Sequence, residues 1–180
     1  MTERITKLAS TSSAALPIAH LLLRILIVVN WLWAAAIVVL LVAMPNERWI
    51  MTSFNLSPSL EASRIVMAMR GIALLGIGAI ALNYLVLKRL LAIVETVRNG
   101  DPFVAANAIR LQAIAWMLLA LQVLGIVIDA IAKTISTPAH PVDLDAGFSI
   151  NGWLAVLLTF LLARVFTEGT ALRDDLEGTV

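Results

Sequence analysis

The sequence predicts an all-α fold: an integral membrane four-helix bundle with a cytoplasmic helical hairpin between its second and third spans. Of the 180 residues, 61% are hydrophobic and only 14% are charged, and the mean hydropathy is +0.94. This balance is far from that of soluble domains. Four apolar runs, at residues 20–44, 65–87, 111–132 and 150–166, approach the roughly 20 residues that a membrane-spanning helix needs. We therefore expect a single membrane domain over residues 1–180.

The first run follows a short polar segment with Arg4 and Lys7, which is also typical of a secretory signal peptide. The run is longer than the core of a signal peptide, which is about 7–15 residues, and Ala43-Met44-Pro45 is a poor cleavage site. We expect a retained span. The chain has no cysteine, which excludes disulfides, thiolate metal sites and thiol nucleophiles.

The basic residues indicate which way the chain crosses the membrane. The amino end, the segment between the second and third runs, and the carboxyl end carry Arg4, Lys7, Arg24, Lys88, Arg89, Arg98, Arg110, Arg164 and Arg173. The opposite side carries Arg48, Arg64, Arg70 and Lys133. Lys and Arg are enriched in cytoplasmic loops, so both termini and the segment 88–110 are predicted to be cytoplasmic.

The segment 88–110 is predicted to form the hairpin. Apolar residues at helical spacing continue past the second run, so this helix should project into the cytoplasm. Asn99-Gly100 is typical of a left-handed helix end, and Asp101-Pro102 is predicted to supply an N-cap oxygen and a proline at the first helical position. A capped turn alone explains these residues, but it does not readily explain Phe103, unless its ring is buried against the carboxyl tail.

The tail, residues 167–180, is predicted to be cytoplasmic, with Leu172, Leu176 and Val180 on one helical stripe. Its acidic residues, Asp174, Asp175 and Glu177, lie off that stripe. They could complement Arg98 and Arg110 of the hairpin. Exposed ion pairs contribute only about 0–1 kcal/mol, so such pairing would position the tail rather than stabilise it.

These segments carry a family resemblance. The matching stretches are Thr96-Val97-Arg98-Asn99-Gly100-Asp101-Pro102-Phe103, then Asn107 and Arg110-Leu111, then Leu162-Ala163-Arg164-Val165-Phe166 and the closing residues 173–180. With them the chain resembles, from its first helix onward, a family of small four-span bacterial membrane proteins catalogued as a domain of unknown function. Members are often encoded beside a small helix-turn-helix regulator of the Cro/C1 type. The resemblance implies the bacterial inner membrane and such a regulator as partner, and it brings no catalytic residues.

Polar residues inside membrane spans are candidate functional residues because burying them in hydrocarbon is costly. Arg70 and Asp129 lie in the outer parts of the second and third spans and could pair or line a polar cavity. Asn83 and Gln122 could form hydrogen bonds between helices. Arg24 and Arg164 lie near the inner ends, where long side chains reach the headgroups.

The sequence offers little catalytic or cofactor chemistry, and we predict no enzyme, cofactor or metal. His20 and His140 fall on opposite sides of the membrane, which disfavours a bis-histidine haem. His140, Asp143 and Asp145 are too unspecific a cluster to predict a metal site. No phosphate-binding glycine loop occurs, and direct nucleic-acid binding is not expected.

The leading hypothesis is a membrane protein that binds or sequesters a small helix-turn-helix regulator through its cytoplasmic hairpin and tail. The candidate contacts are Arg98, Asp101, Phe103, Asn107, Arg110, Asp174, Asp175 and Glu177. One alternative is a small-molecule transporter, channel or ligand sensor with a cavity near Arg70 and Asp129. The other is a structural subunit of a larger membrane complex.

Overall fold

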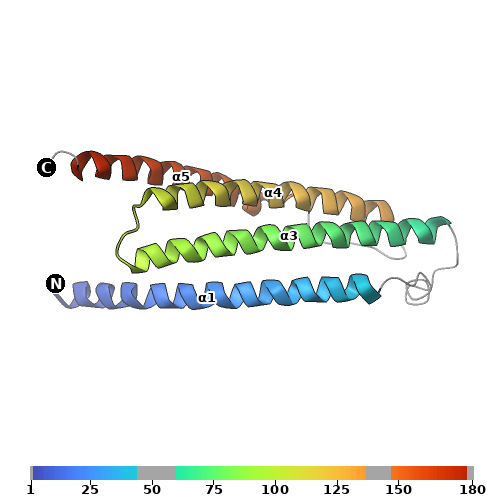
Figure 1. Cartoon of the computed structure of the whole chain (residues 1–180), viewed down its shortest axis with the longest axis horizontal. Coiled ribbons are helices and arrows are strands. Elements are labelled where there is room, and N and C mark those ends of the chain that lie inside the picture. The colour runs from blue at the N-terminus through green and yellow to red at the C-terminus, as the bar shows by residue number, and fades with distance from the viewer. Residues whose placement is uncertain (1, 44–59, 137–146, 178–180) are drawn as a thin grey trace.

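The computed structural model describes residues 2–43, 60–136 and 147–177. These residues form four helices and, within those ranges, no strand: α1 (Thr2–Ala43), α3 (Leu60–Arg98), α4 (Ala105–Ile135) and α5 (Ile150–Glu177) (Figure 1). The predicted all-α class is confirmed. Each helix contains a segment long and apolar enough to cross a membrane: Leu16–Val42, Ser63–Arg98, Ala105–Ile135 and Ile150–Arg173. The protein is therefore a multi-pass membrane protein.

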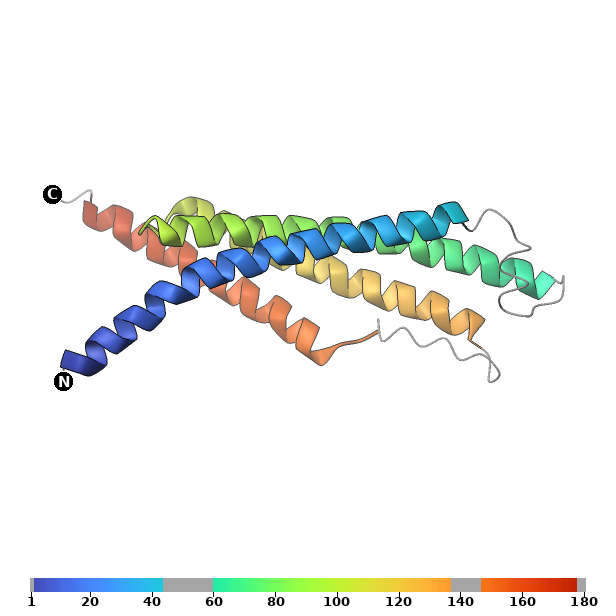
Figure 2. The ribbon, with the colours of Figure 1, turned by 90° about the horizontal axis from the view of Figure 1, so that it is seen from below.

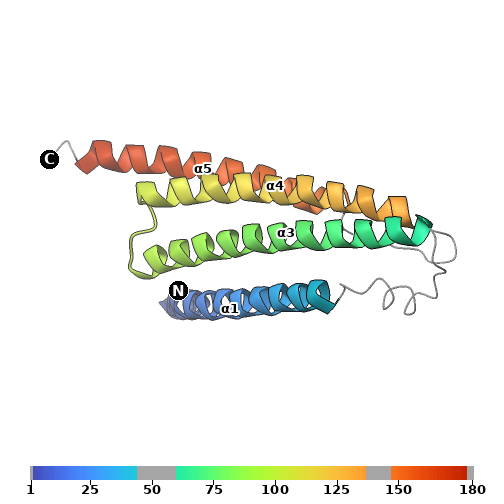
Figure 3. The same ribbon diagram turned by 45° about the vertical axis from the view of Figure 1, so that its right-hand side comes forward.

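The helices are arranged as an open bundle, in the order in which they occur along the chain. α1 packs against α3, α3 against α4, and α4 against α5, while no other pair of these four helices is in contact. Figure 1 and Figure 3 show the same order from two directions, and Figure 2 shows α5 crossing the other helices at an angle. Because α5 does not pack against α1, the bundle stays open, and α1 and α5 each keep one broad side without a helical neighbour.

Alanines are prominent among the buried residues between the helices, beside a few larger ones such as Ile114, while most large apolar side chains point outward. Ala115 and Ala132 of α4 are 0% and 1% exposed, whereas Trp33 of α1 and Leu157 of α5 are 64% and 66% exposed. Lipid tails are as apolar as leucine, so membrane helices associate through close packing of small residues rather than through burial of large apolar ones. The exposed apolar surface is therefore what a bilayer requires.

The start of α1, the connection between α3 and α4, and the end of α5 all lie at one end of the molecule (Figure 1). We call this the hairpin end. It brings the predicted hairpin and tail together. α3 runs without a break from Leu60 to Arg98 and α5 continues to Glu177, which confirms the predicted helical stem and the helical tail.

The turn at the hairpin end differs in part from the prediction. Gly100 has a φ of +85°, and the amides of Gly100 and Asp101 donate to the carbonyls of Val97 and Thr96, which makes a Schellman motif. The predicted left-handed helix end is thus confirmed. The predicted start of the next helix is wrong, because α4 begins at Ala105 with Val104 in the N-cap position and no side-chain cap. Asp101 pairs with the tail instead.

Candidate functional site

Asn107 ties the hairpin together from the inside. Its side chain is fully buried, and its amide nitrogen donates to Thr96 Oγ1 at 2.7 Å and to the Pro102 carbonyl at 2.9 Å. Its amide oxygen accepts a hydrogen bond from Arg110 Nη1 at 2.8 Å. One amide thus connects α3, the turn and α4. Because Asn107 is buried, it no longer belongs among the residues proposed to contact a partner.

Phe103, just after the turn, is seated on α5. Its ring lies 5.3 Å from the ring of Phe166, measured between centroids, and 46% of the residue is exposed. At Gly169 an added Cβ would lie 3.4 Å from Phe103 Cδ1, so the ring rests over a residue without a side chain. The alternative interpretation of Phe103, packing against the tail, is the one that the structure shows.

An ion pair also joins the turn to the tail. Arg173 of α5 donates from Nη1 to Asp101 Oδ1 and, at 3.5 Å, to the Phe103 carbonyl. The side chains of Arg173 and Asp101 are 44% and 47% exposed, so this pair is worth little in stability and serves mainly to orient the tail.

The charges of this ion pair are the reverse of those expected. The sequence predicted that acidic residues of the tail would complement Arg98 and Arg110, but a basic residue of the tail meets an acidic residue of the turn. Among the described side chains neither Arg98 nor Arg110 pairs with the tail: Arg98 is exposed, and Arg110 bonds Asn107 and, at 3.5 Å, the Ala92 carbonyl. The reversal arises because α5 crosses the turn at Arg173, which brings its guanidinium to the Asp101 carboxylate.

The predicted candidate contacts whose side chains the structure describes fall into two groups. Arg98 and Asp175 are exposed, and Asp101 and Phe103 are partly exposed, all at the hairpin end. Asn107 and Arg110 lie inside the hairpin. The side chains of Asp174 and Glu177 fall outside the described part of the structure.

Arg70 and Asp129, the predicted intramembrane pair, do not pair with each other. Asp129 is bound to Lys133, one turn further along α4, at 2.7 Å, and its side chain is only 16% exposed. Gly147 lies directly beside it, since a Cβ there would be 2.8 Å from Asp129 Oδ2. A partner four residues away on the same helix is always within reach, whereas Arg70 belongs to another helix.

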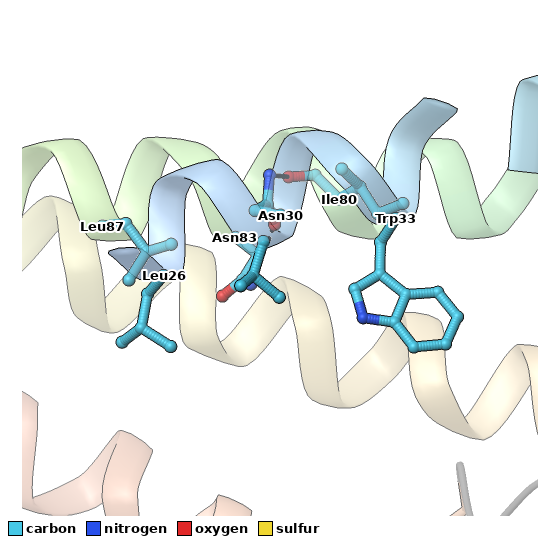
Figure 4. Close-up of a pocket in the computed structure, with 7 residues that line it drawn as sticks. Leu26, Asn30, Trp33, Ile80, Asn83 and Leu87 are labelled. Carbon is cyan, nitrogen blue, oxygen red and sulfur yellow. Dashed lines mark hydrogen bonds between the residues drawn. The ribbon is translucent and has the colours of Figure 1, made fainter. Parts of the chain in front are cut away.

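A different polar pair joins α1 to α3. Asn83 Nδ2 donates to Asn30 Oδ1 at 3.0 Å, and Asn30 Nδ2 donates to the Ile80 carbonyl at 3.2 Å. The predicted interhelical hydrogen bond of Asn83 is confirmed, and Asn30, only 6% exposed, is its partner. The two asparagines border a pocket of about 420 Å³ between these helices. Figure 4 shows the lining residues, which are Leu26, Val29, Asn30, Trp33, Ile80, Asn83 and Leu87.

Sequence reasoning placed a polar cavity near Arg70 and Asp129 rather than here. This pocket lies ten or more residues along α3 from Arg70. The only signal in the sequence was a single asparagine in each of two apolar runs. An asparagine in an apolar run indicates a polar group that is costly to bury in hydrocarbon. It does not reveal that the two asparagines face each other.

We expect the bond between Asn30 and Asn83 to be measurable as a coupling energy. In a double-mutant cycle with Asn30→Leu and Asn83→Leu, the two effects on the free energy of unfolding should be non-additive by about 0.6 kcal/mol, the average for hydrogen bonds between membrane helices, and by at most about 1.7 kcal/mol. Unfolding by sodium dodecyl sulfate, followed by circular dichroism, would measure it. The matched control is Asn83→Leu with Gln112→Leu on α4, which should be additive.

Metal-binding chemistry finds no support in the described ranges, which contain no group of three or more acidic or histidine side chains that could hold an ion. His140, Asp143 and Asp145, the cluster considered in the sequence, lie in the segment 137–146, outside those ranges.

The helices and the hairpin define the class of protein: a small four-span membrane protein with a structured helical hairpin and tail at one end. The chain belongs to the DUF2975 family, described as proteins of unknown function, whose model matches residues 44–180. The match includes α3, α4, α5 and the turn between α3 and α4, and it confirms the family resemblance seen in the sequence, although it begins after α1 rather than at the first helix. Comparison with curated proteins and with solved structures gives no match.

Proposed function

We propose that the protein is a membrane-embedded binding protein that holds a small cytoplasmic helix-turn-helix regulator at its hairpin end. The observation that carries this proposal is the ordered hairpin end itself. Asn107 ties α3 to α4, and Phe103 and Asp101 tie the turn to α5. A loop that only connected two spans would not need three sets of contacts, whereas a docking surface has to be held in one shape.

The lengths of the helices support a surface outside the bilayer. α3 has 39 residues, which at 1.5 Å per residue is about 58 Å, nearly twice the roughly 30 Å of a bilayer core. α5 ends with Arg173 and Asp175, residues that do not belong in hydrocarbon. Both helices have more length than a membrane crossing requires.

The charge distribution supports a cytoplasmic position for the hairpin end in a bacterial inner membrane. The basic residues of α1, the hairpin and α5 outnumber those of the opposite end, and cytoplasmic segments are enriched in Lys and Arg. A regulator of transcription is found in that compartment.

The proposed contact surface consists of Arg98, Asp101, Phe103 and Asp175, with Asp174 and Glu177 of the tail. A DNA-binding protein carries a basic surface, which the acidic residues of the tail complement. Binding there would compete with DNA for the same basic surface. The regulator would then be held at the membrane and away from its operators.

The test is capture of a partner from the cytosol of the source cells by the full chain in mild detergent, followed by titration of the captured protein. The variant is Arg98→Glu with Asp175→Lys, two exposed side chains whose exchange leaves the net charge unchanged. We expect binding to weaken roughly tenfold or more, equal to about 1.4 kcal/mol or more. Arg64→Gln with Thr134→Lys, two exposed positions at the opposite end whose exchange also leaves the net charge unchanged, is the control and should bind normally.

Capture of a small DNA-binding protein by the native chain and its loss in the variant would support the proposal. Equal binding by the variant and the native chain would show that the surface is wrong. Recovery of another membrane protein and no soluble partner would overturn the proposal in favour of a structural subunit. A change in flux or ligand response with Arg70→Ala would favour the transporter or sensor.

A further inference from the structure

Contacts between the helices show which residues of different helices lie at the same height in the membrane. Asn30 of α1 meets Ile80 and Asn83 of antiparallel α3, so Arg24, six residues towards the hairpin end, lies level with about residues 86–89. Arg89 of α3 contacts Met117 of α4, and Arg110 of α4 contacts the carbonyl of Ala92.

α5 adds one more basic residue at this height. Trp116 of α4 packs on Phe160 of α5 with the ring centroids 5.3 Å apart, and Arg164 lies one turn further towards the hairpin end. The basic residues that share this height are Arg24, Lys88, Arg89, Arg110 and Arg164. When their heights are projected onto α3, they span about five residues, or roughly 7 Å at a rise of 1.5 Å per residue. Such a band marks the level of the phospholipid headgroups, which long basic side chains reach from apolar helices.

Two residues of this band differ from the others because they lie in the seam between α3 and α4. Arg89 and Arg110 are both partly buried. Arg89 reaches from α3 to Met117 Sδ at 3.5 Å, and Arg110 reaches from α4 to the carbonyl of Ala92 at 3.5 Å. Ala92 is three residues after Arg89, and residues three apart share a helix face. Arg89 thus reaches across the seam from α3, and Arg110 reaches across it from α4.

Among the residues that the structure describes, no carboxylate forms an ion pair with either arginine. The ion pairs of the described residues join Lys133 to Asp129, Arg164 to Glu168 and Arg173 to Asp101, and include neither Arg89 nor Arg110. Glu95, the nearest acidic residue along α3, is exposed and is likewise in none of these pairs. Lys88, beside Arg89, is exposed and adds a third positive charge.

Most N–H groups of the two arginines also donate no hydrogen bond to the described residues. A guanidinium has five N–H groups, and Arg89 meets one thioether sulfur, which is a weak acceptor. Arg110 meets Asn107 and the Ala92 carbonyl through a single nitrogen, Nη1. Partly buried positive charge without a counter-ion is costly, and a phosphate diester accepts paired hydrogen bonds from arginine in a geometry that fits its planar fork.

We infer that the seam between α3 and α4 binds the phosphate of an anionic phospholipid, with Arg89 and Arg110 as donors and Lys88 at the rim. The source of the phosphate is a lipid rather than a soluble anion, because the seam lies between two membrane-spanning helices at headgroup height. The acyl chains would continue along the exposed apolar face of these helices. The site is separate from the proposed regulator surface and does not depend on it.

The experiment measures binding of phosphatidylglycerol to the purified full chain in detergent, by native mass spectrometry across a lipid titration, with phosphatidylcholine as the neutral reference. Arg89→Gln with Arg110→Gln should weaken phosphatidylglycerol binding roughly tenfold or more and leave phosphatidylcholine unchanged. The control is Arg64→Gln with Arg98→Gln, which removes the same charge from exposed positions outside the band. It should change binding by less than about threefold, because exposed charges act only through a screened field.

Arg110 also contacts Asn107, so Arg89→Gln alone provides a variant that leaves the hairpin intact and should lose part of the affinity. Equal losses in the two double variants would mean that net charge, not a site, attracts the lipid, and would overturn the inference. Unchanged affinity in Arg89→Gln would overturn it as well. In a further arm, displacement of the lipid by millimolar inorganic phosphate would show a site for soluble anions and would overturn the assignment to a lipid.

Discussion

Replacing Asn107 with leucine is expected to lower the free energy of unfolding by about 2–3 kcal/mol, the largest effect of any single substitution considered for this protein. The amide is fully buried and bonds Thr96, the Pro102 carbonyl and Arg110. Leucine would leave the partly buried Pro102 carbonyl and Arg110 guanidinium without this partner. Each buried polar group left without a partner costs about 1–3 kcal/mol.

The effect of Asn107→Leu is measured as the shift in unfolding by sodium dodecyl sulfate, with helix content followed by circular dichroism. Gln112→Leu is the matched control, because Gln112 is an exposed amide on the same helix. It should change the free energy of unfolding by less than about 0.5 kcal/mol. Similar effects of both substitutions would contradict the role of Asn107 as the tie between the two helices.

Substitution of Gly100 by alanine is expected to destabilise the protein by about 1–2 kcal/mol. Gly100 has a φ of +85°, in the left-handed region, where a Cβ comes too close to the following carbonyl oxygen. Apart from the two neighbouring residues of the chain, no atom lies within 4 Å of the position that the Cβ would take, so the cost arises from the local backbone alone. Both hydrogen bonds of the Schellman motif depend on that conformation.

Gly78→Ala is the matched control and should have the opposite sign. Gly78 lies inside α3, is exposed and also has no atom within 4 Å of an added Cβ. Alanine is favoured over glycine inside a helix by about 0.5–1 kcal/mol. Thermal unfolding of both variants in the same detergent tests the pair. If both substitutions stabilise the protein, the left-handed turn at the hairpin end is wrong.

Much of the candidate site could be predicted because its signals are local. Asn99-Gly100 indicated a left-handed helix end, and Gly100 has that conformation. The apolar spacing after Leu87 indicated that the helix continues, and α3 runs to Arg98. Asp101-Pro102 misled because both residues are common where a helix begins. Asp101 is held by Arg173 instead, and the chain remains outside any helix until α4 starts after the extended Val104.

The polar pairs could not be predicted in the same way. Asp101 and Arg173 are separated by 72 residues, and Asn30 and Asn83 by 53. Each pair requires two helices to be rotated and shifted by the right amount, and an error of one residue turns a side chain by about 100°. The possible pairing of Arg70 with Asp129 required such an alignment of two helices. Asp129 binds Lys133 on its own helix instead.

The sequence by itself determined four membrane-spanning helices, the position of the hairpin turn and the helical tail, because hydropathy, helical period and glycine conformation act over a few neighbouring residues. Only the tertiary structure decided the open order of the helices, the reversed ion pair between turn and tail, and the contacts of Arg89 and Arg110 across the seam between α3 and α4. The physical reason is that all faces of these helices are apolar enough for lipid. Hydrophobicity therefore does not select which faces meet, and small residues and a few buried polar groups decide it.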